Sequence, residues 1–342
     1  RLSARAHLPR RARVPDLRRH QRRAEDHHHA RAVALLKSDR VSSLLMEIPT
    51  NPEIPFFAYG AFRPGELAFL KIREFVDRCE QDGVPGTLRI RDGLPIADLA
   101  STNSQIDGFL IFFREGTQEE AHKKIVELEP DKQYEWKPIQ SIGGQTANIL
   151  AGLKPRKGSK ELEEPWTGKN DPLFTSALEV IDEVLDDIQN HQSTWDLKPL
   201  FRLEMAYLLL WTAIERYASL RYHLYRNANQ KVEEISTEMA FQNALRKYVK
   251  SEPDGNFRTV NRADNPEESY KLDPGNPKKS IKYYYQVRSN LTHRGKGIHA
   301  DHHMMLSSLQ ELIAIFRETL AAAFAKSAQM LAENRGAASA SS

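Results

Sequence analysis

Short apolar runs separated by turn residues dominate the chain between residues 46 and 153. Residues 55–60 (Pro-Phe-Phe-Ala-Tyr-Gly) predict a buried strand that ends at a glycine turn. Further runs of this kind predict strands over residues 86–90, 106–113 and 134–139. Helical spacing predicts helices over residues 66–80 and 117–128. This mixture indicates a small α+β domain over residues 46–153.

Beyond residue 172 the apolar spacing becomes helical. Alternating steps of four and three residues separate Phe174, Leu178, Ile181, Leu185 and Ile188, which places them in one stripe on a helix of about 17 residues. Further helices are predicted over residues 200–225, 237–250, 279–293 and 301–330, with a long loop over 251–277. We therefore expect an all-α domain over residues 173–330.

Two segments flank this helical domain. Residues 154–172 are charged, contain Pro and Gly and show no period, so we expect a linker. Residues 331–342 are rich in Ala and Ser, and we expect a disordered tail.

Basic residues are concentrated at the N-terminus. Residues 1–45 contain 12 of the 49 Lys and Arg residues but only 4 of the 46 Asp and Glu residues, so the net charge of +3 hides an acidic remainder. An Arg-rich segment suits a nucleic-acid-binding tail or a transit peptide. We favour a third interpretation, a disordered or non-native leader ahead of a true start at Met46.

Composition limits the class of protein. With 342 residues, 40% hydrophobic and 28% charged, the chain can form two globular domains. No uncharged apolar run approaches the roughly 18–20 residues that span a bilayer, so we expect no membrane association. The single cysteine, Cys79, excludes an internal disulfide framework and suits the cytoplasm.

One segment of the helical half carries residues suited to phosphate chemistry. In residues 283–297 (Tyr-Tyr-Tyr-Gln-Val-Arg-Ser-Asn-Leu-Thr-His-Arg-Gly-Lys-Gly), Arg288 precedes His293 by five positions. Histidine titrates near neutrality and can move protons, whereas the arginine fork holds phosphate oxygens. Five positions span about 140° on an ideal helix, so both side chains reach one cleft only if the helix ends or bends at His293.

This order of residues is the hallmark of the HEPN family (higher eukaryotes and prokaryotes nucleotide-binding domains). The hallmark is an arginine, a polar residue, three further residues and a histidine, on a late helix of a bundle. The region 171–330, including a long helix with Trp211 and Glu215, resembles this family. The resemblance implies a metal-independent ribonuclease with Arg288 and His293 as catalytic residues. It also implies a homodimer in which two motifs line a shared groove.

Cleavage of RNA by its own 2′-hydroxyl needs a proton acceptor, a proton donor and a cation, and it selects RNA over DNA. We expect Asn290 and Lys296 to assist in binding RNA. A structural alternative stays open for the motif. In that alternative Arg288 pairs with a glutamate of the bundle, and His293 caps a helix C-terminus, where the helix dipole favours a cation.

The N-terminal half contains a second set of ordered motifs. The loop after the first strand is Tyr59-Gly60-Ala61-Phe62-Arg63-Pro64-Gly65, and residues 84–88, 107–110 and 125–129 follow it. Together they resemble the γ-glutamyl cyclotransferase-like fold, a small β-barrel with this loop at its mouth.

This second resemblance implies a site for a γ-glutamyl-type small molecule. Backbone amides of Tyr59, Gly60, Ala61 and Phe62 would bind the substrate, and glycine suits such close approach. Glu129 would act as general acid/base while the α-amine attacks the γ-carbonyl and 5-oxoproline is released. The alternative is a surface glutamate on a domain that only binds or regulates.

A histidine-rich segment precedes the last predicted helix. His299, Asp301, His302 and His303 include pairs three or four residues apart, a spacing that can hold a metal. The same residues suit a solvated helix start with Asp301 near the cap. Without a third well-spaced ligand, we expect no metal and no cofactor.

These patterns predict an α+β protein, a cyclotransferase-like barrel followed by an all-α HEPN bundle. The expected function is RNA cleavage by a homodimer in defence or a toxin-like stress response, with an antitoxin as a candidate partner. Two alternatives remain. One is a γ-glutamyl cyclotransferase dimerised by an inactive helical domain, and the other is a non-catalytic binding scaffold.

Overall fold

The computed structural model describes residues 46–340 except residues 92, 101–103, 129–132, 154–157, 191–196, 223–227 and 295–301. For some helical residues, His293 and Arg294 among them, it describes the backbone but not the side chain. The leader over residues 1–45 lies outside the described residues. The residues described from Met46 onward belong to one compact unit.

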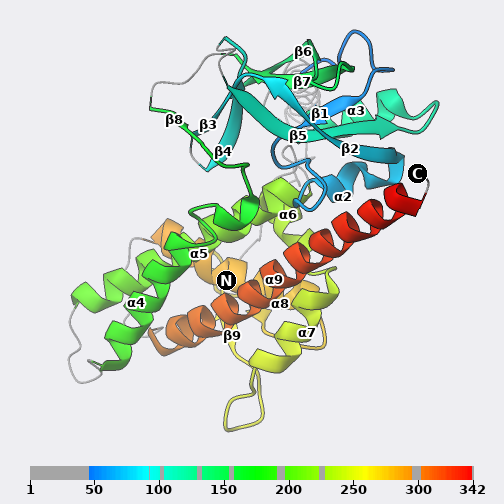
Figure 1. Cartoon of the computed structure of the whole chain (residues 1–342). Helices are drawn as coiled ribbons and strands as arrows, with labels where there is room; N and C mark the ends of the chain where they lie inside the picture. The colour runs from blue at the N-terminus through cyan, green and yellow to red at the C-terminus, as the bar shows by residue number, and fades with distance from the viewer. Residues whose placement is uncertain are drawn as a thin grey trace, which may run out of the picture. The chain divides into compact units, whose positions relative to one another are not determined.

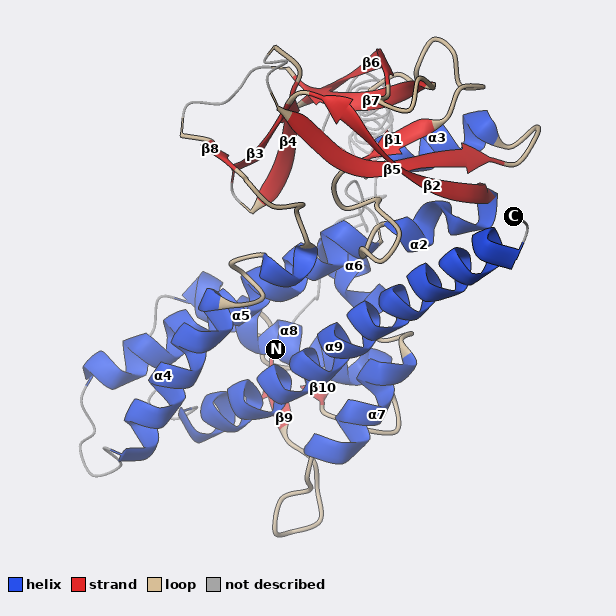
Figure 2. Ribbon diagram, in the orientation of Figure 1, coloured by secondary structure: helices blue, strands red, loops and turns tan. Residues whose placement is uncertain are grey.

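Eight described strands in the N-terminal part form one mixed sheet (Figures 1 and 2). Their order is β2-β5-β1-β7-β4-β3-β8, and β6 pairs with β7 outside this path. The strands are β1 (Phe56–Ala58), β2 (Val76–Pro85), β3 (Thr87–Arg91), β4 (Leu94–Asp98), β5 (Gln105–Phe113), β6 (Tyr134–Gln140), β7 (Thr146–Gly152) and β8 (Lys160–Glu161). The strands predicted from the sequence correspond to β1, β3, β5 and β6, whereas β2, β4, β7 and β8 were missed.

This sheet is open, although a closed barrel was expected. Among the described strands, β2 and β8 each pair with one neighbour, so the path has two ends. β7 has three partners: β6 along its whole length, β1 at Asn148 and Ile149, and β4 at Ala151. A strand has two edges, and β6 occupies one edge of β7, so β1 and β4 share the other edge of β7. Two groups of strands therefore branch from β7 where a ring was expected.

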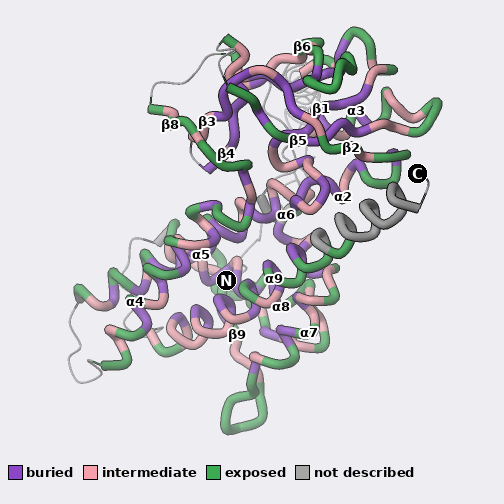
Figure 3. The backbone as a smooth tube through the Cα atoms, viewed as in Figure 1, coloured by how far each residue is buried: buried purple, intermediate pink, exposed green. Residues whose placement is uncertain are grey.

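The strand β1, in the middle of the sheet, is buried (Figure 3). In β1, Phe56 and Ala58 pack in one apolar cluster and Phe57 packs in another, as strand alternation requires. The first cluster includes residues of α2 (Phe69–Ile72) and α3 (Gln118–Val126). Two-sided burial explains why the sequence of β1 is continuously apolar.

The helix predicted over residues 66–80 is wrong beyond residue 75. α2 and the short 3-10 helix η1 (Arg73–Phe75) occupy residues 69–75, and β2 begins at Val76. β2 pairs with β5 at one end of the sheet path, and most of its side chains before Gly83 are at least partly exposed. Its polar residues therefore resemble the solvent face of a helix in the sequence.

Residues 158–172 pack onto the fold, although a linker was expected. The Trp166 side chain is buried, and its indole Nε1 donates a hydrogen bond to the Gly93 carbonyl at 2.9 Å. The Gly168 amide donates to Glu66 Oε2 at 2.9 Å. A single aromatic anchor among charged residues gives no period, so sequence spacing does not reveal it.

The C-terminal part is helical. Its helices are η2 (Gly168–Asn170), α4 (Ser176–Asn190), α5 (Leu197–Arg221), α6 (Ala228–Ile235), α7 (Met239–Tyr248), α8 (Pro277–Arg294) and α9 (His302–Ala340). The helices predicted from the sequence correspond to α4, α5, α7, α8 and α9. The predicted loop before α8 contains a hairpin, β9 (Thr259–Asn261) and β10 (Ser269–Lys271), and the backbone of α9 continues through most of the predicted tail.

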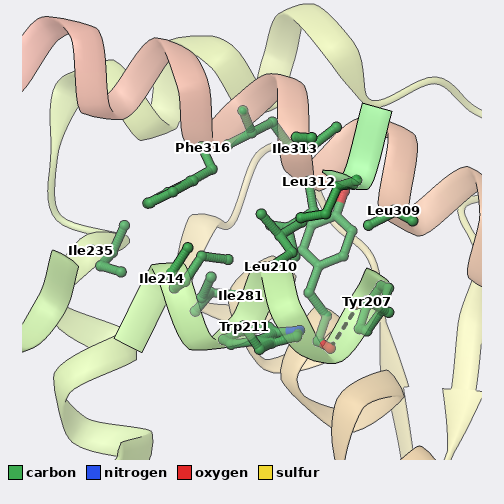
Figure 4. Close-up of a cluster of buried hydrophobic side chains, with 14 of the residues drawn as sticks. Tyr207, Leu210, Trp211, Ile214, Ile235, Ile281, Leu309, Leu312, Ile313 and Phe316 are labelled. Atoms are coloured by element: carbon green, nitrogen blue, oxygen red, sulfur yellow. Dashed lines mark hydrogen bonds between the residues drawn. The ribbon is translucent and has the colours of Figure 1, made fainter. Parts of the chain in front are cut away.

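The helical core forms around α5 (Figure 4). It joins side chains of four helices, Tyr207, Leu210, Trp211 and Ile214 of α5, Ile235 of α6, Ile281 of α8, and Leu309, Leu312, Ile313 and Phe316 of α9. The Tyr207 hydroxyl donates to the Tyr284 carbonyl at 3.0 Å, which fixes α8 against α5. None of the helices within the described ranges is both long and apolar enough to cross a bilayer.

His122 of α3 is a buried titratable group in the sheet domain. Its ring is fully buried, lies edge-on to the rings of Phe56, Phe113 and Trp136, and forms a 2.8 Å hydrogen bond through Nδ1 with the Gln118 carbonyl. Burial lowers the pKa of His122 to about 4, because the charged imidazolium would lose its hydration.

We expect His122 to make the fold acid-labile between pH 6.5 and 4. In this range the unfolded chain binds a proton that the native state does not, so stability falls as the pH falls, by roughly 3 kcal/mol in total. A His122→Phe variant lacks this contribution, and any packing penalty of the larger ring is independent of pH. Urea unfolding at a series of pH values checks this, and parallel curves for the two proteins would contradict it.

Candidate functional site

A cavity of about 400 Å³ lies beside the loop that follows β1. The loop contributes Tyr59, Gly60, Ala61 and Phe62, the residues predicted to bind a small molecule. Apolar side chains make up much of the remaining lining, among them Phe56, Leu94, Pro95, Leu128, Leu150 and Leu173. The cavity is therefore suited to a small molecule with an apolar body.

Close packing fixes the shape of this loop. A Cβ atom at Gly60 would lie 2.7 Å from Pro95 Cγ, so only glycine lets the loop approach β4 this closely. The Tyr59 hydroxyl donates to the Leu150 carbonyl at 2.6 Å, and the Tyr134 hydroxyl donates to the Pro95 carbonyl at 2.9 Å. The first bond ties the loop after β1 to β7, and the second ties β6 to β4.

The helical half supplies one wall of the cavity. Thr212, Glu215, Arg216 and Ser219 of α5 line it, with the spacing i, i+3, i+4 and i+7 that places residues on one helix face. The sequence predicts the helix but not this stripe. Its signal is a set of polar residues at helical spacing within an apolar-rich helix.

Arg216 is held by a buried carboxylate. Its Nε donates to Asp171 Oδ2 at 2.9 Å, and the Asp171 side chain is 1% exposed. Asp171 Oδ1 accepts a hydrogen bond from the Leu173 amide at 3.0 Å. The pair fixes the segment that enters α4 against α5 and places Arg216 at the cavity wall.

Glu215 connects the cavity with the arginine of the predicted ribonuclease motif. Glu215 Oε1 lies 3.5 Å from Arg288 Nη2, and the two side chains are 34% and 28% exposed. The Cζ atom of Arg288 also lies 5.4 Å from the centroid of the Tyr285 ring. The arginine therefore pairs with a bundle glutamate, which is the first half of the structural alternative considered above, while its side chain stays partly exposed.

This ion pair is incompletely hydrogen-bonded. Glu215 Oε1 and Arg288 Nε are both buried atoms without a hydrogen-bond partner among the described residues. A charge-assisted hydrogen bond is usually about 2.7–2.9 Å long, so the 3.5 Å separation marks a loose contact.

Asn290 has a structural position. Its side chain accepts from the Ala263 amide at 3.0 Å and from Gln286 Nε2 at 2.7 Å, and donates to the Asn261 carbonyl at 2.8 Å. It is buried and holds the hairpin segment against α8. These bonds occupy the amide that we expected to assist RNA binding.

Three predicted site residues fall where no side chain is described. His293 lies on α8, five residues after Arg288, with only its backbone described. Glu129 and Lys296 lie outside the described residues, although Leu128 and Gln133, on either side of the segment that contains Glu129, line the cavity. The structure thus brings the Tyr59–Phe62 loop near Glu215, and Glu215 to Arg288.

Metal ligands are not clustered in the part of the chain that the structure describes: no group of three or more His, Cys, Asp or Glu residues could hold an ion there. Of the histidine-rich segment, His302 and His303 are described, whereas His299 and Asp301 are not.

Comparisons with known proteins add one distant similarity. No protein-family model matches the chain, and a search of curated proteins finds no match. Among solved structures, the crystal structure of uncharacterized protein PH0828 from Pyrococcus horikoshii matches with 18% sequence identity and a TM-score of 0.27. The match covers 32% of this chain and 86% of that one.

We expect Asp171→Asn to lower the free energy of unfolding by about 3 kcal/mol, because it leaves the Arg216 charge without its buried partner. The matched control is Asp186→Asn, an exposed position on α4, with an expected change within about 0.5 kcal/mol. Urea unfolding followed by circular dichroism measures both. Equal midpoints for the two variants would show that the pair does not stabilise the fold.

Proposed function

We propose that the chain is a metal-independent ribonuclease of HEPN type, in which Arg288 holds the scissile phosphate and His293 transfers protons. The observation that supports this best is the state of Arg288, which is 28% exposed and contacts Glu215 only loosely at 3.5 Å. A guanidinium held in this way keeps donors for phosphate oxygens. His293 follows on the same helix, next to its last residue.

The proposed reaction needs no metal. The 2′-hydroxyl of RNA attacks the adjacent phosphorus and loses its proton, and the 5′-oxygen leaves with a proton. The products are a 2′,3′-cyclic phosphate and a 5′-hydroxyl. An imidazole can serve as proton acceptor or donor near neutral pH. Arg288 would stabilise the negative charge that develops on the phosphate oxygens.

The assembly and partners belong to the same proposal. We propose a homodimer through the helical domain, in which two copies of the motif line one groove for RNA. The setting we propose is defence or a toxin-like stress response, with an antitoxin as a further partner.

A second function is favoured by the cavity. We propose that residues 46–153 form a cyclotransferase-like domain, in which the Tyr59–Phe62 loop binds a γ-glutamyl-type small molecule and Glu129 acts as general acid/base. The support is that the loop lines a cavity of about 400 Å³ together with Leu128, the residue before Glu129. With this domain active and the helical domain inactive, the protein would be a dimeric cyclotransferase. With neither site active, it would be a binding scaffold.

The ribonuclease proposal predicts that the full-length protein cleaves single-stranded RNA in EDTA and leaves 2′,3′-cyclic phosphate ends. We expect His293→Ala to reduce the rate at least about 100-fold, because it removes the proton-transfer group. The dimer should stay intact by light scattering.

The control for this experiment is His303→Ala, an exposed histidine of α9, with an expected rate equal to that of the wild type. A DNA oligonucleotide of the same sequence, which lacks the 2′-hydroxyl groups, should not be cleaved. Undiminished cleavage by His293→Ala would end the ribonuclease assignment.

The second proposal predicts release of 5-oxoproline from γ-glutamyl dipeptides. Glu129→Gln should abolish this release without changing the RNA cleavage rate, because the amide cannot accept the proton of the substrate amine. Detection of 5-oxoproline by mass spectrometry measures it. Equal turnover by wild type and Glu129→Gln would exclude this glutamate as the base.

A further inference from the structure

The wall of this largely apolar cavity contains an acidic side chain, Glu215. Among the described lining residues, Glu215 is the only acidic side chain. The neighbouring Arg216 has its own carboxylate partner, because Asp171 binds it at 2.9 Å from outside the cavity lining. Glu215 therefore presents negative charge to a largely apolar space.

The partner of Glu215 lies on its far side. Arg288 is on α8 and is not among the lining residues, so it contacts Glu215 from outside the cavity. The contact is 3.5 Å long, longer than a charge-assisted hydrogen bond, and the Glu215 side chain is 34% exposed. The carboxylate can therefore also accept a bond from a donor that enters the cavity.

We infer that the cavity binds a small organic ammonium with an apolar body, and that Glu215 is an acceptor shared between this ligand and Arg288. The apolar side chains Phe56, Phe62, Leu94 and Leu128 would bury the body of the ligand. Its ammonium group would donate to Glu215, where low local polarity strengthens the bond.

Because the ligand and Arg288 share the carboxylate of Glu215, their contacts with it compete. An ammonium on Glu215 cancels the negative charge next to Arg288 and weakens the hold on the guanidinium. By reciprocity, removal of the Arg288 charge strengthens the attraction between Glu215 and the ligand. If Arg288 holds RNA phosphate, the ligand would also strengthen RNA binding; this last consequence rests on the proposed function.

The test is a calorimetric titration of 2-phenylethylamine, at neutral pH, into the full-length protein. We expect Glu215→Gln to weaken binding about tenfold or more, because it removes the charge that pairs with the ammonium. We expect Arg288→Gln to tighten it about fivefold, the lower end of typical coupling between sites. 2-Phenylethanol, which has the same body without the charge, should bind weakly and equally to wild type and Glu215→Gln.

The matched control is Glu233→Gln. Glu233 of α6 also pairs with cations of α8, Lys278 and Lys282, at 2.9 and 3.0 Å, but it does not line the cavity. Its replacement should leave amine affinity unchanged. If Glu215→Gln fails to fold by circular dichroism, Glu215→Asp keeps the charge, and Arg288→Gln tests the sharing on its own.

Two results would overturn the inference. Equal amine affinity in wild type and Glu215→Gln would mean that another group binds the ammonium. Unchanged or weaker affinity in Arg288→Gln would mean that Glu215 is not shared. Absence of RNA cleavage by the wild type would defeat the ribonuclease proposal instead, and the titrations would still decide this one.

Discussion

Two adjacent residues of opposite charge on α5 connect the parts of the candidate site. Consecutive residues diverge by about 100° around a helix, so Glu215 and Arg216 point to different neighbours. Arg216 binds the buried Asp171 at the entry to α4, and Glu215 meets Arg288 of α8. Both also line the cavity beside the sheet. A single turn of one helix thus connects the sheet domain, the entry to α4 and the arginine motif.

The amphipathic parts of the fold could be predicted from the sequence. The stripe from Phe174 to Ile188 and the apolar run in β1 follow from burial on one helix face and on both sheet faces. β2 could not be recognised, because most of its side chains are at least partly exposed and its period is lost. The branching of β1 and β4 from β7 depends on pairing between distant residues, which local spacing does not encode.

The separate parts of the candidate site could be predicted from the sequence, but the contacts that connect them could not. The Tyr59–Phe62 loop and Arg288 are visible as motifs, because glycine turns and a basic residue on a late helix are local features. Their link through Glu215 depends on how α5 packs against the sheet domain. For Asn290 the sequence was misleading. A polar residue on an amphipathic helix suggests contact with solvent, but in the fold the amide of Asn290 bonds to the hairpin segment.

The position of β7 has a consequence for how the chain folds as it is made. Among the described strands, β1 pairs only with β5 and β7, about 50 and 90 residues later along the chain, and β4 pairs with β7 as well as with β3. These long separations mean large loop closures and slow assembly. On the ribosome, one edge of β1 and one edge of β4 would stay unpaired until synthesis has passed Gly152. The emerging N-terminal half therefore has a period of vulnerability to aggregation and chaperone capture that ends only when β7 leaves the exit tunnel.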